Sequence, residues 1–195
     1  SNNTAMGFQA LKGNTTGTSN TAMGYQALVD NTTGYANTAM GLFALEANTT
    51  GYENVAIGSQ ALQENITGRE SIAIGSRTLQ TSTAGYGNIA IGIIALQKDT
   101  TGNENIAIGS KTLSVNTTGT ANVAVGYWAL LRNTTANYNI AIGRSALQNN
   151  STGENNTAVG NAALYANTAS NNTAIGFNAL YSNKASNNTA VGYNA

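Results

Sequence analysis

A five-residue motif, Asn-x-Ala followed by Met, Ile or Val and then Gly, recurs twelve times along the 195-residue chain, with Ser71 in place of Asn in the fifth copy. Successive motif glycines lie 17 residues apart nine times in a row and then 16 residues apart twice. A short, fixed interval is typical of one small structural unit stacked on copies of itself, so the repeat predicts a solenoid. The motif glycines are Gly7, Gly24, Gly41, Gly58, Gly75, Gly92, Gly109, Gly126, Gly143, Gly160, Gly176 and Gly192.

Each repeat also carries an Ala before the apolar motif residue and a Leu four residues after the motif Gly. A unit of this length is too short for a helical repeat, which needs roughly 33 residues. Its Gly, Asn and β-branched residues also disfavour helix. We therefore predict an all-β fold, a parallel β-solenoid of about twelve coils. Each coil is expected to have two short strands, one formed by the motif and one centred on Ala-Leu, joined by turns such as Asn-Thr-Thr-Gly. The stacked Asn residues of this turn can form side-chain amide ladders from coil to coil.

The motif strand is apolar on both faces. In residues 54–58, Val55 and Ile57 share one face, while Ala56 and Gly58 share the other. A strand of this kind is normally covered on both sides. We expect the larger Val and Ile side chains to fill the interior with the Leu column, and the small face to contact another chain. The predicted chain–chain seam comprises Ala56, Gly58, Ala73, Gly75, Ala90, Gly92, Ala107 and Gly109.

The composition excludes several functional classes. The eight basic and eight acidic residues cancel and form no basic patch, which argues against a nucleic-acid partner. No apolar run approaches 20 residues, so this segment is not expected to insert into a membrane. The chain has no Cys or His, and its two Asp residues, Asp30 and Asp99, lie far apart. We expect neither a metal site within one chain nor a cofactor, while an ion on a symmetry axis stays open.

Three kinds of side chain recur in columns that invite a functional interpretation. Glu53 and Glu70 occupy one column and could match the carboxylate spacing of a retaining glycosidase, but a solvated turn beside Arg69 is the favoured interpretation, so no catalysis is expected. The stacked Thr residues suggest ice binding as one alternative, and the Asn-x-Thr sequons suggest glycosylation as another. For both patterns, local hydrogen bonding within the turn is the favoured interpretation.

Aromatic residues supply the candidate surface contacts. Tyr35, Tyr52, Tyr86 and Trp128 lie at surface-like positions after the turn or after the motif Gly. Such rings could stack on a sugar or a protein partner. Alternatively, they cover the edge of the solenoid or seal a seam between chains.

The repeats resemble a known family. The stretches 54–61, 71–75, 105–110 and 122–126 are similar to the repeat of YadA-like head domains of trimeric autotransporter adhesins, with related repeats in bacterial and phage fibre proteins. The resemblance covers the whole chain and implies a left-handed parallel β-roll, assembled as a homotrimer on the cell surface and used in adhesion. The interval is longer than the family's usual one, and the additional residues lie in the Asn-Thr-Thr-Gly turn.

Together these observations predict a single repeat array over residues 1–195, part of a longer fibre. Its expected function is structural or adhesive, in an extracellular trimeric fibre on a bacterial surface or a virion. Identical chains are the expected partners, with a host-surface glycan or protein as a further one. Two alternatives remain open: the receptor-binding shaft of a phage tail fibre, and a subunit of a homopolymeric extracellular filament or matrix.

Overall fold

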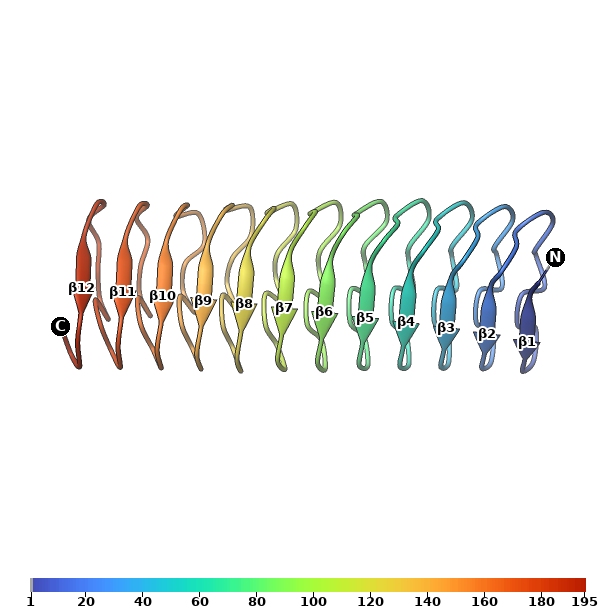
Figure 1. Cartoon of the computed structure of the whole chain (residues 1–195), viewed down its shortest axis with the longest axis horizontal. Helices are drawn as coiled ribbons and strands as arrows, with labels where there is room; N and C mark the ends of the chain where they lie inside the picture. Colours follow the sequence, from blue (N-terminus) through green and yellow to red (C-terminus); the bar gives the residue numbers. More distant parts are fainter. Residues whose placement is uncertain (1) are drawn as a thin grey trace.

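The computed structural model describes residues 2–195, and Ser1 lies outside the described residues. They form a parallel β-solenoid whose twelve strands stack in chain order into one sheet, with the two termini at opposite ends (Figure 1). We number each coil by its strand. The strands are β1 (Thr4–Met6), β2 (Thr21–Met23), β3 (Thr38–Met40), β4 (Val55–Ile57), β5 (Ile72–Ile74), β6 (Ile89–Ile91), β7 (Ile106–Ile108), β8 (Val123–Val125), β9 (Ile140–Ile142), β10 (Thr157–Val159), β11 (Thr173–Ile175) and β12 (Thr189–Val191).

Each strand pairs in parallel with its own copy in the next coil. In β4 and β5, for example, Val55 pairs with Ile72, Ala56 with Ala73, and Ile57 with Ile74. Since one coil equals one repeat, equivalent residues stack along the axis about 4.8 Å apart. The predicted all-β solenoid with coils of about 17 residues is therefore confirmed.

The predicted second strand is wrong: each coil contains one strand, and the Ala-Leu segment forms turns. Two residues of this segment in coil 4, Gln60 and Leu62, have φ angles of 59° and 49°. Left-handed residues interrupt the two-residue alternation that defines a strand. The segment is nevertheless bonded to its neighbours, since the Leu62 amide donates to the Thr78 carbonyl over 3.0 Å.

Backbone conformation explains why the Leu column contains no Ile or Val. All eleven of these Leu residues, from Leu11 to Leu180, have φ between 48° and 55°. A positive φ is especially unfavourable for β-branched side chains. Leu, which is not branched at Cβ, therefore occupies this column.

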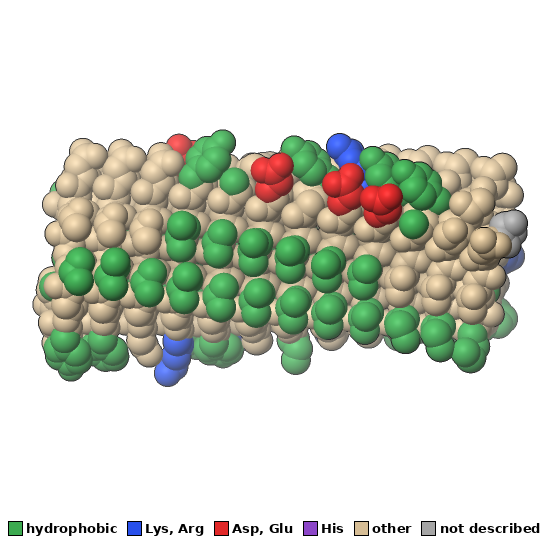
Figure 2. Space-filling model, in the orientation of Figure 1, with side chains coloured by type: hydrophobic (Ala, Val, Ile, Leu, Met, Phe, Trp, Pro, Cys, Tyr) green, Lys and Arg blue, Asp and Glu red, His purple; other side chains and the backbone are tan. Residues whose placement is uncertain are grey.

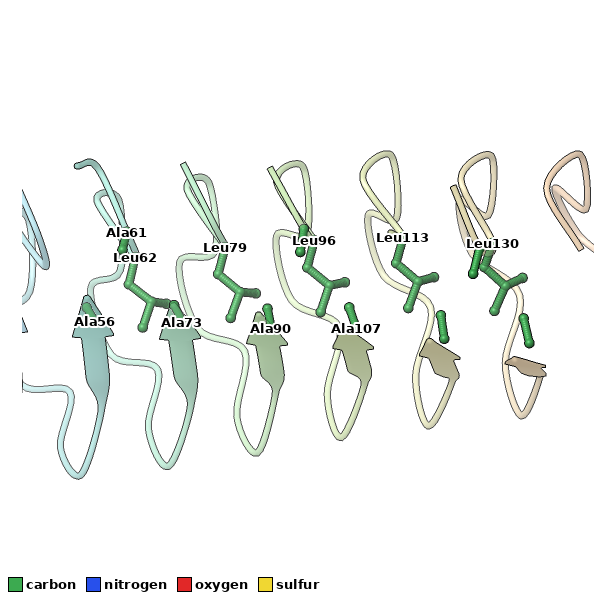
Figure 3. Close-up of a cluster of buried hydrophobic side chains, with 14 of the residues drawn as sticks. Ala56, Ala61, Leu62, Ala73, Leu79, Ala90, Leu96, Ala107, Leu113 and Leu130 are labelled. Atoms are coloured by element: carbon green, nitrogen blue, oxygen red, sulfur yellow. The ribbon is translucent and has the colours of Figure 1, made fainter. Parts of the chain in front are cut away.

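The interior is filled by Ala from the strands and by Ala and Leu from the opposite side. Ala56, Ala73, Ala90 and Ala107 have no exposed surface, and neither do Leu79 and Leu96. In Figure 3 the Leu side chains extend across the coil toward the Ala side chains of the strands. The expectation that Val and Ile fill the interior is therefore wrong. A coil this thin holds one Leu opposite one Ala, and the larger strand residues face outward.

Each motif Gly is required by its contact with the next coil. Gly58 has φ +132°, and a Cβ built on it would lie 2.7 Å from the carbonyl carbon of Gly75. The same approach recurs at almost every motif Gly, so the column permits tight stacking along the axis.

Two files of Asn side chains run through the interior. In the turn file, most Asn amides donate to the Oδ1 of the previous coil, as from Asn31 to Asn14 over 2.8 Å and from Asn48 to Asn31 over 2.7 Å. The predicted Asn ladder is thus confirmed. The motif Asn residues form a second file, in which Asn54 donates to the Gly68 carbonyl over 2.8 Å while its backbone amide donates to Asn37 Oδ1.

Candidate interaction surfaces

The outward side of the sheet carries the largest apolar surface. We define the outward face as the first and third residues of every strand, which alternate with the buried Ala. The third residues form a long row of Met, Ile or Val in all twelve coils, and Ile57, Ile108 and Ile142 are 37%, 38% and 41% exposed. The first residues form a shorter apolar row in coils 4 to 9 only: Val55, Ile72, Ile89, Ile106, Val123 and Ile140.

Figure 2 shows both rows as parallel lines of hydrophobic side chains along the body. No charged residue belongs to the outward face, since its members are all Thr, Met, Val or Ile. The shorter row spans roughly 24 Å and the longer roughly 53 Å at the usual strand spacing. A continuous apolar surface of this kind on a soluble protein marks an interaction site. The motif strand is thus apolar on both faces, as expected, but its large side chains are the uncovered ones.

The predicted seam residues lie elsewhere. The Ala side chains of the predicted seam (Ala56, Ala73, Ala90 and Ala107) are enclosed within the chain and cannot reach another copy. The glycines (Gly58, Gly75, Gly92 and Gly109) face the neighbouring coil of the same chain. The assignment of this seam was wrong because periodicity identifies the two faces of a strand without telling which one is inside.

Three of the four predicted aromatic contacts form one row on the turn side. This Tyr-Arg row contains Tyr35, Tyr52, Arg69 and Tyr86 in coils 2 to 5 after the turn Gly. The rings of Tyr35 and Tyr52 stack with centroids 4.8 Å apart and planes 5° apart, and the Arg69 guanidinium lies 4.9 Å from the Tyr86 centroid. Burial by the neighbouring rings, followed by the Glu53 charge, raises the pKa of Tyr35. Most ring faces are therefore already covered, and the edges remain free for contact.

Trp128 does not join this row. Its ring stacks on Tyr127 with centroids 4.4 Å apart, on the side of the coil that follows the motif Gly. It has φ +65° and is half-buried. The four aromatic candidates therefore do not form one surface.

The Glu column is exposed at the turn that precedes each motif. Glu53, Glu70 and Glu104 all have exposed side chains and positive φ. Arg69 lies 3.6 Å from Glu70, which matches the expected solvated turn. The surface of residues 2–195 has no pocket that would enclose a substrate beside these carboxylates.

The Thr and Asn columns are engaged within the solenoid. Thr32 Oγ1 donates to the Thr49 carbonyl over 2.9 Å, and equivalent bonds recur along the turn. The sequon residues Asn31, Asn48 and Asn65 are fully buried. The amides of these three residues are enclosed in the folded chain, so the recurrence of this sequon follows from the ladder.

Within the described part of the chain, no three His, Cys, Asp or Glu residues cluster as metal ligands would, and no helix is long and apolar enough to span a membrane. Comparison with protein-family models, curated proteins and solved structures finds no match.

Proposed function

We propose that this chain is a structural, adhesive segment of an extracellular fibre, in which three copies associate through the outward face. The fibre segment performs no catalysis. In this proposal the coils form the left-handed β-roll that the repeat resemblance implies. The observation that carries the proposal is the pair of continuous apolar rows along the outward face.

The regularity of the outward face favours a second copy of this chain as its partner. Its side chains repeat at the strand spacing, so an identical row offers a matching period along the whole length. Since the face lacks charge, its burial leaves no unpaired ion. Burying apolar area at about 25 cal/mol per Å² stabilises association, and the effect accumulates along the rod.

Ile91 and Ile93 provide a matched test. Both are exposed Ile residues of coil 6, 36% and 60% respectively, but Ile91 belongs to the outward face and Ile93 lies beyond the motif Gly. We expect Ile91→Lys to dissociate the assembly into monomers and Ile93→Lys to leave it intact, because only the first would bury a charge between copies. Sedimentation equilibrium of the two variants and the original chain measures this.

A monomeric original chain at every accessible concentration would overturn the proposal, and so would equal effects of both substitutions. Circular dichroism of each variant establishes that the solenoid is intact before the masses are compared.

Contact with a host-surface glycan or protein is proposed at the exposed edges of the Tyr-Arg row. Glycan-array binding tests it, with Tyr35→Ala and Tyr52→Ala expected to reduce the signal. Tyr138→Ala is the control, since Tyr138 is 63% exposed and lies outside the row. Loss of binding in the control alone would contradict this location.

A further inference from the structure

The turn file of Asn residues is interrupted in coils 5 and 6. Ser82 and Asp99 occupy positions that hold Asn in coils 1 to 4 and 7 to 11. Both side chains are buried, with 1% and 0% of their surface exposed. The interruption therefore lies inside the solenoid, where no solvent replaces a missing hydrogen bond.

Each Asn of this file uses its two side-chain atoms differently. In most coils Oδ1 accepts from the next coil, while Nδ2 donates to the previous coil and to the carbonyl three residues further on, as from Asn48 to Asn31 and to Gly51. Outside the interruption, Asn133 is the exception, because its Oδ1 has no partner and the Asn150 amide donates to Gly153 only. Ser82 has no amide that could donate to the Asn side chain of the previous coil, and Asn65 Oδ1 has no partner. An acceptor without a donor is left in the core.

Asp99 reproduces only half of the Asn pattern. Its Oδ1 accepts from Asn116 Nδ2 over 2.6 Å, as an Asn Oδ1 would. Its Oδ2 takes the place of the amide nitrogen and has no partner. In an Asn of this file, the Nδ2 position faces the carbonyl three residues further on and the side chain of the previous coil. For Asp99 these groups belong to Gly102 and Ser82. If the carboxylate were charged, Asp99 Oδ2 would be a hydrogen-bond acceptor facing another acceptor, the Gly102 carbonyl oxygen.

No neighbouring charge compensates for a carboxylate at this position. The turn of the previous coil contributes Thr81, Ser82 and Thr83, and that of the next contributes Val115, Asn116 and Thr117, all uncharged. The charged residues nearest in the same coil, Lys98 and Glu104, have exposed side chains. Burial therefore raises the pKa of Asp99 to about 7, against the lowering effect of the bonds from Asn116 and Gly102.

We propose that Asp99 is a buried proton-binding site, in which a neutral carboxylic acid replaces the missing amide. Oδ1 accepts from Asn116, and the Oδ2 hydroxyl donates where an Asn would donate through Nδ2. When the acceptor is Ser82 Oγ, the Ser82 hydroxyl is free to donate to Asn65 Oδ1. One proton then satisfies both orphan acceptors and restores a continuous file across coils 4 to 7.

The proton links stability to pH in a defined direction. The pKa of Asp99 is higher in the folded chain, about 7, than its ordinary value of 3.8, so the folded chain binds more protons between these values. Stability is greatest at low pH, falls as pH rises from about 4 through about 7, and is level above that. Between pH 5 and pH 8 the unfolding equilibrium constant is expected to increase on the order of 100-fold through this group.

Asp99→Asn tests the proposal, because it supplies the amide permanently. Urea unfolding of the chain between pH 5 and pH 8 is expected to show a smaller pH dependence in this variant and a higher midpoint at pH 8. Asp30→Asn is the control, since Asp30 is exposed, and it should leave the pH dependence unchanged. Ser82→Asn should stabilise the chain while keeping the pH dependence, because the amide oxygen that it introduces accepts the same proton.

A direct titration keeps the proposal falsifiable should the variants fold poorly. The ¹³C shift of the Asp99 carboxyl in the folded original chain is expected to change with a midpoint near 7. A midpoint near 4 overturns the proposal. Equal pH dependence of the Asp99→Asn variant and the original chain also overturns it.

Discussion

Coils 4 to 9 and the coils at either end share one backbone but differ at a single outward position. The first strand residue is Val or Ile in the central six coils and Thr in coils 1 to 3 and 10 to 12. The third residue is apolar throughout. In Figure 2 the shorter row accordingly covers only the middle of the body. The difference indicates that the solenoid accepts either Thr or an apolar residue at the first outward position.

The ends differ from the centre in a second way. In β1 every residue is exposed, whereas each central strand has a fully buried Ala. A terminal coil has a neighbour on one side only, and thus half the stacking contacts. The same substitution should therefore cost less at an end than in the centre, and the predictions use this contrast.

The largest effect is expected at the motif Gly. Gly92→Ala would place a Cβ 2.5 Å from the Gly109 carbonyl oxygen, whereas the nearest atom to a Cβ on Gly192 is 3.6 Å away. Gly92→Ala should destabilise the chain by about 4 kcal/mol, combining backbone strain with broken stacking. Gly192→Ala carries only the strain, about 1 kcal/mol. Denaturant unfolding measures both, and equal costs would refute the importance of coil-to-coil contact.

A smaller loss is expected in the Leu column. Leu96 is fully buried, and its replacement by Ala should cost about 3 kcal/mol by leaving a cavity. Leu180 is only partly buried in coil 11, so Leu180→Ala should cost about half as much. Chemical denaturation of the two variants provides the comparison; a larger loss at Leu180 would contradict it.

The shorter apolar row can be tested by replacing its Ile residues with the Thr that the terminal coils carry at the same position. Combined Ile72→Thr, Ile89→Thr and Ile106→Thr should weaken association by about 1 kcal/mol per site in each chain, because less apolar surface is buried. Stability of the single chain should change less than association, since these side chains face outward and are only half-buried in the single chain. Sedimentation measures the first effect and urea unfolding the second. The opposite outcome, lost stability with unchanged association, would place these residues in the fold instead.

Thr157→Ile and Thr173→Ile provide the complementary change. They extend the short row into coils 10 and 11 and should tighten association by about 1 kcal/mol per site in each chain. Sedimentation at low protein concentration detects the shift. Unchanged affinity would mean that the partner contacts only the central coils.

The smallest effect is expected in the Tyr-Arg row. Tyr52→Ala removes one ring stack and the neighbouring Arg69 contact and should cost about 1 kcal/mol. Tyr138→Ala, on an exposed ring outside the row, should cost less than roughly 0.5 kcal/mol, the range of ordinary surface changes. Equal costs in thermal or urea unfolding would indicate that stacking in the row contributes no stability.

Much of the fold could be predicted from the sequence, because the repeat interval fixes the coil and stacks equal residues. The Asn ladder followed from this stacking alone. The orientation of the strand could not be predicted, since both faces are apolar and the interior width depends on the opposite side. One signal was present: Leu is never replaced by Ile or Val in its column, which is typical of a positive φ.

The role of Asp99 was equally accessible and was missed. Asp99 was considered as a metal ligand because of its chemistry, whereas its position in the Asn column determines its surroundings. An uncovered apolar face of the strand was predicted, but it was assigned to the Ala and Gly residues instead of the larger Val and Ile residues. In a repeat protein, the column that a residue occupies is therefore as informative as its type.

The hydrogen bonds between coils run along the long axis, so tension applied between the two termini loads all coil boundaries in series. The outermost coil, which is held on one side only, is expected to yield first, and the next coil then becomes the outermost one. Each released coil of 17 residues lengthens the chain by about 55 Å. The rod is therefore expected to lengthen under tension in equal steps from its ends inward.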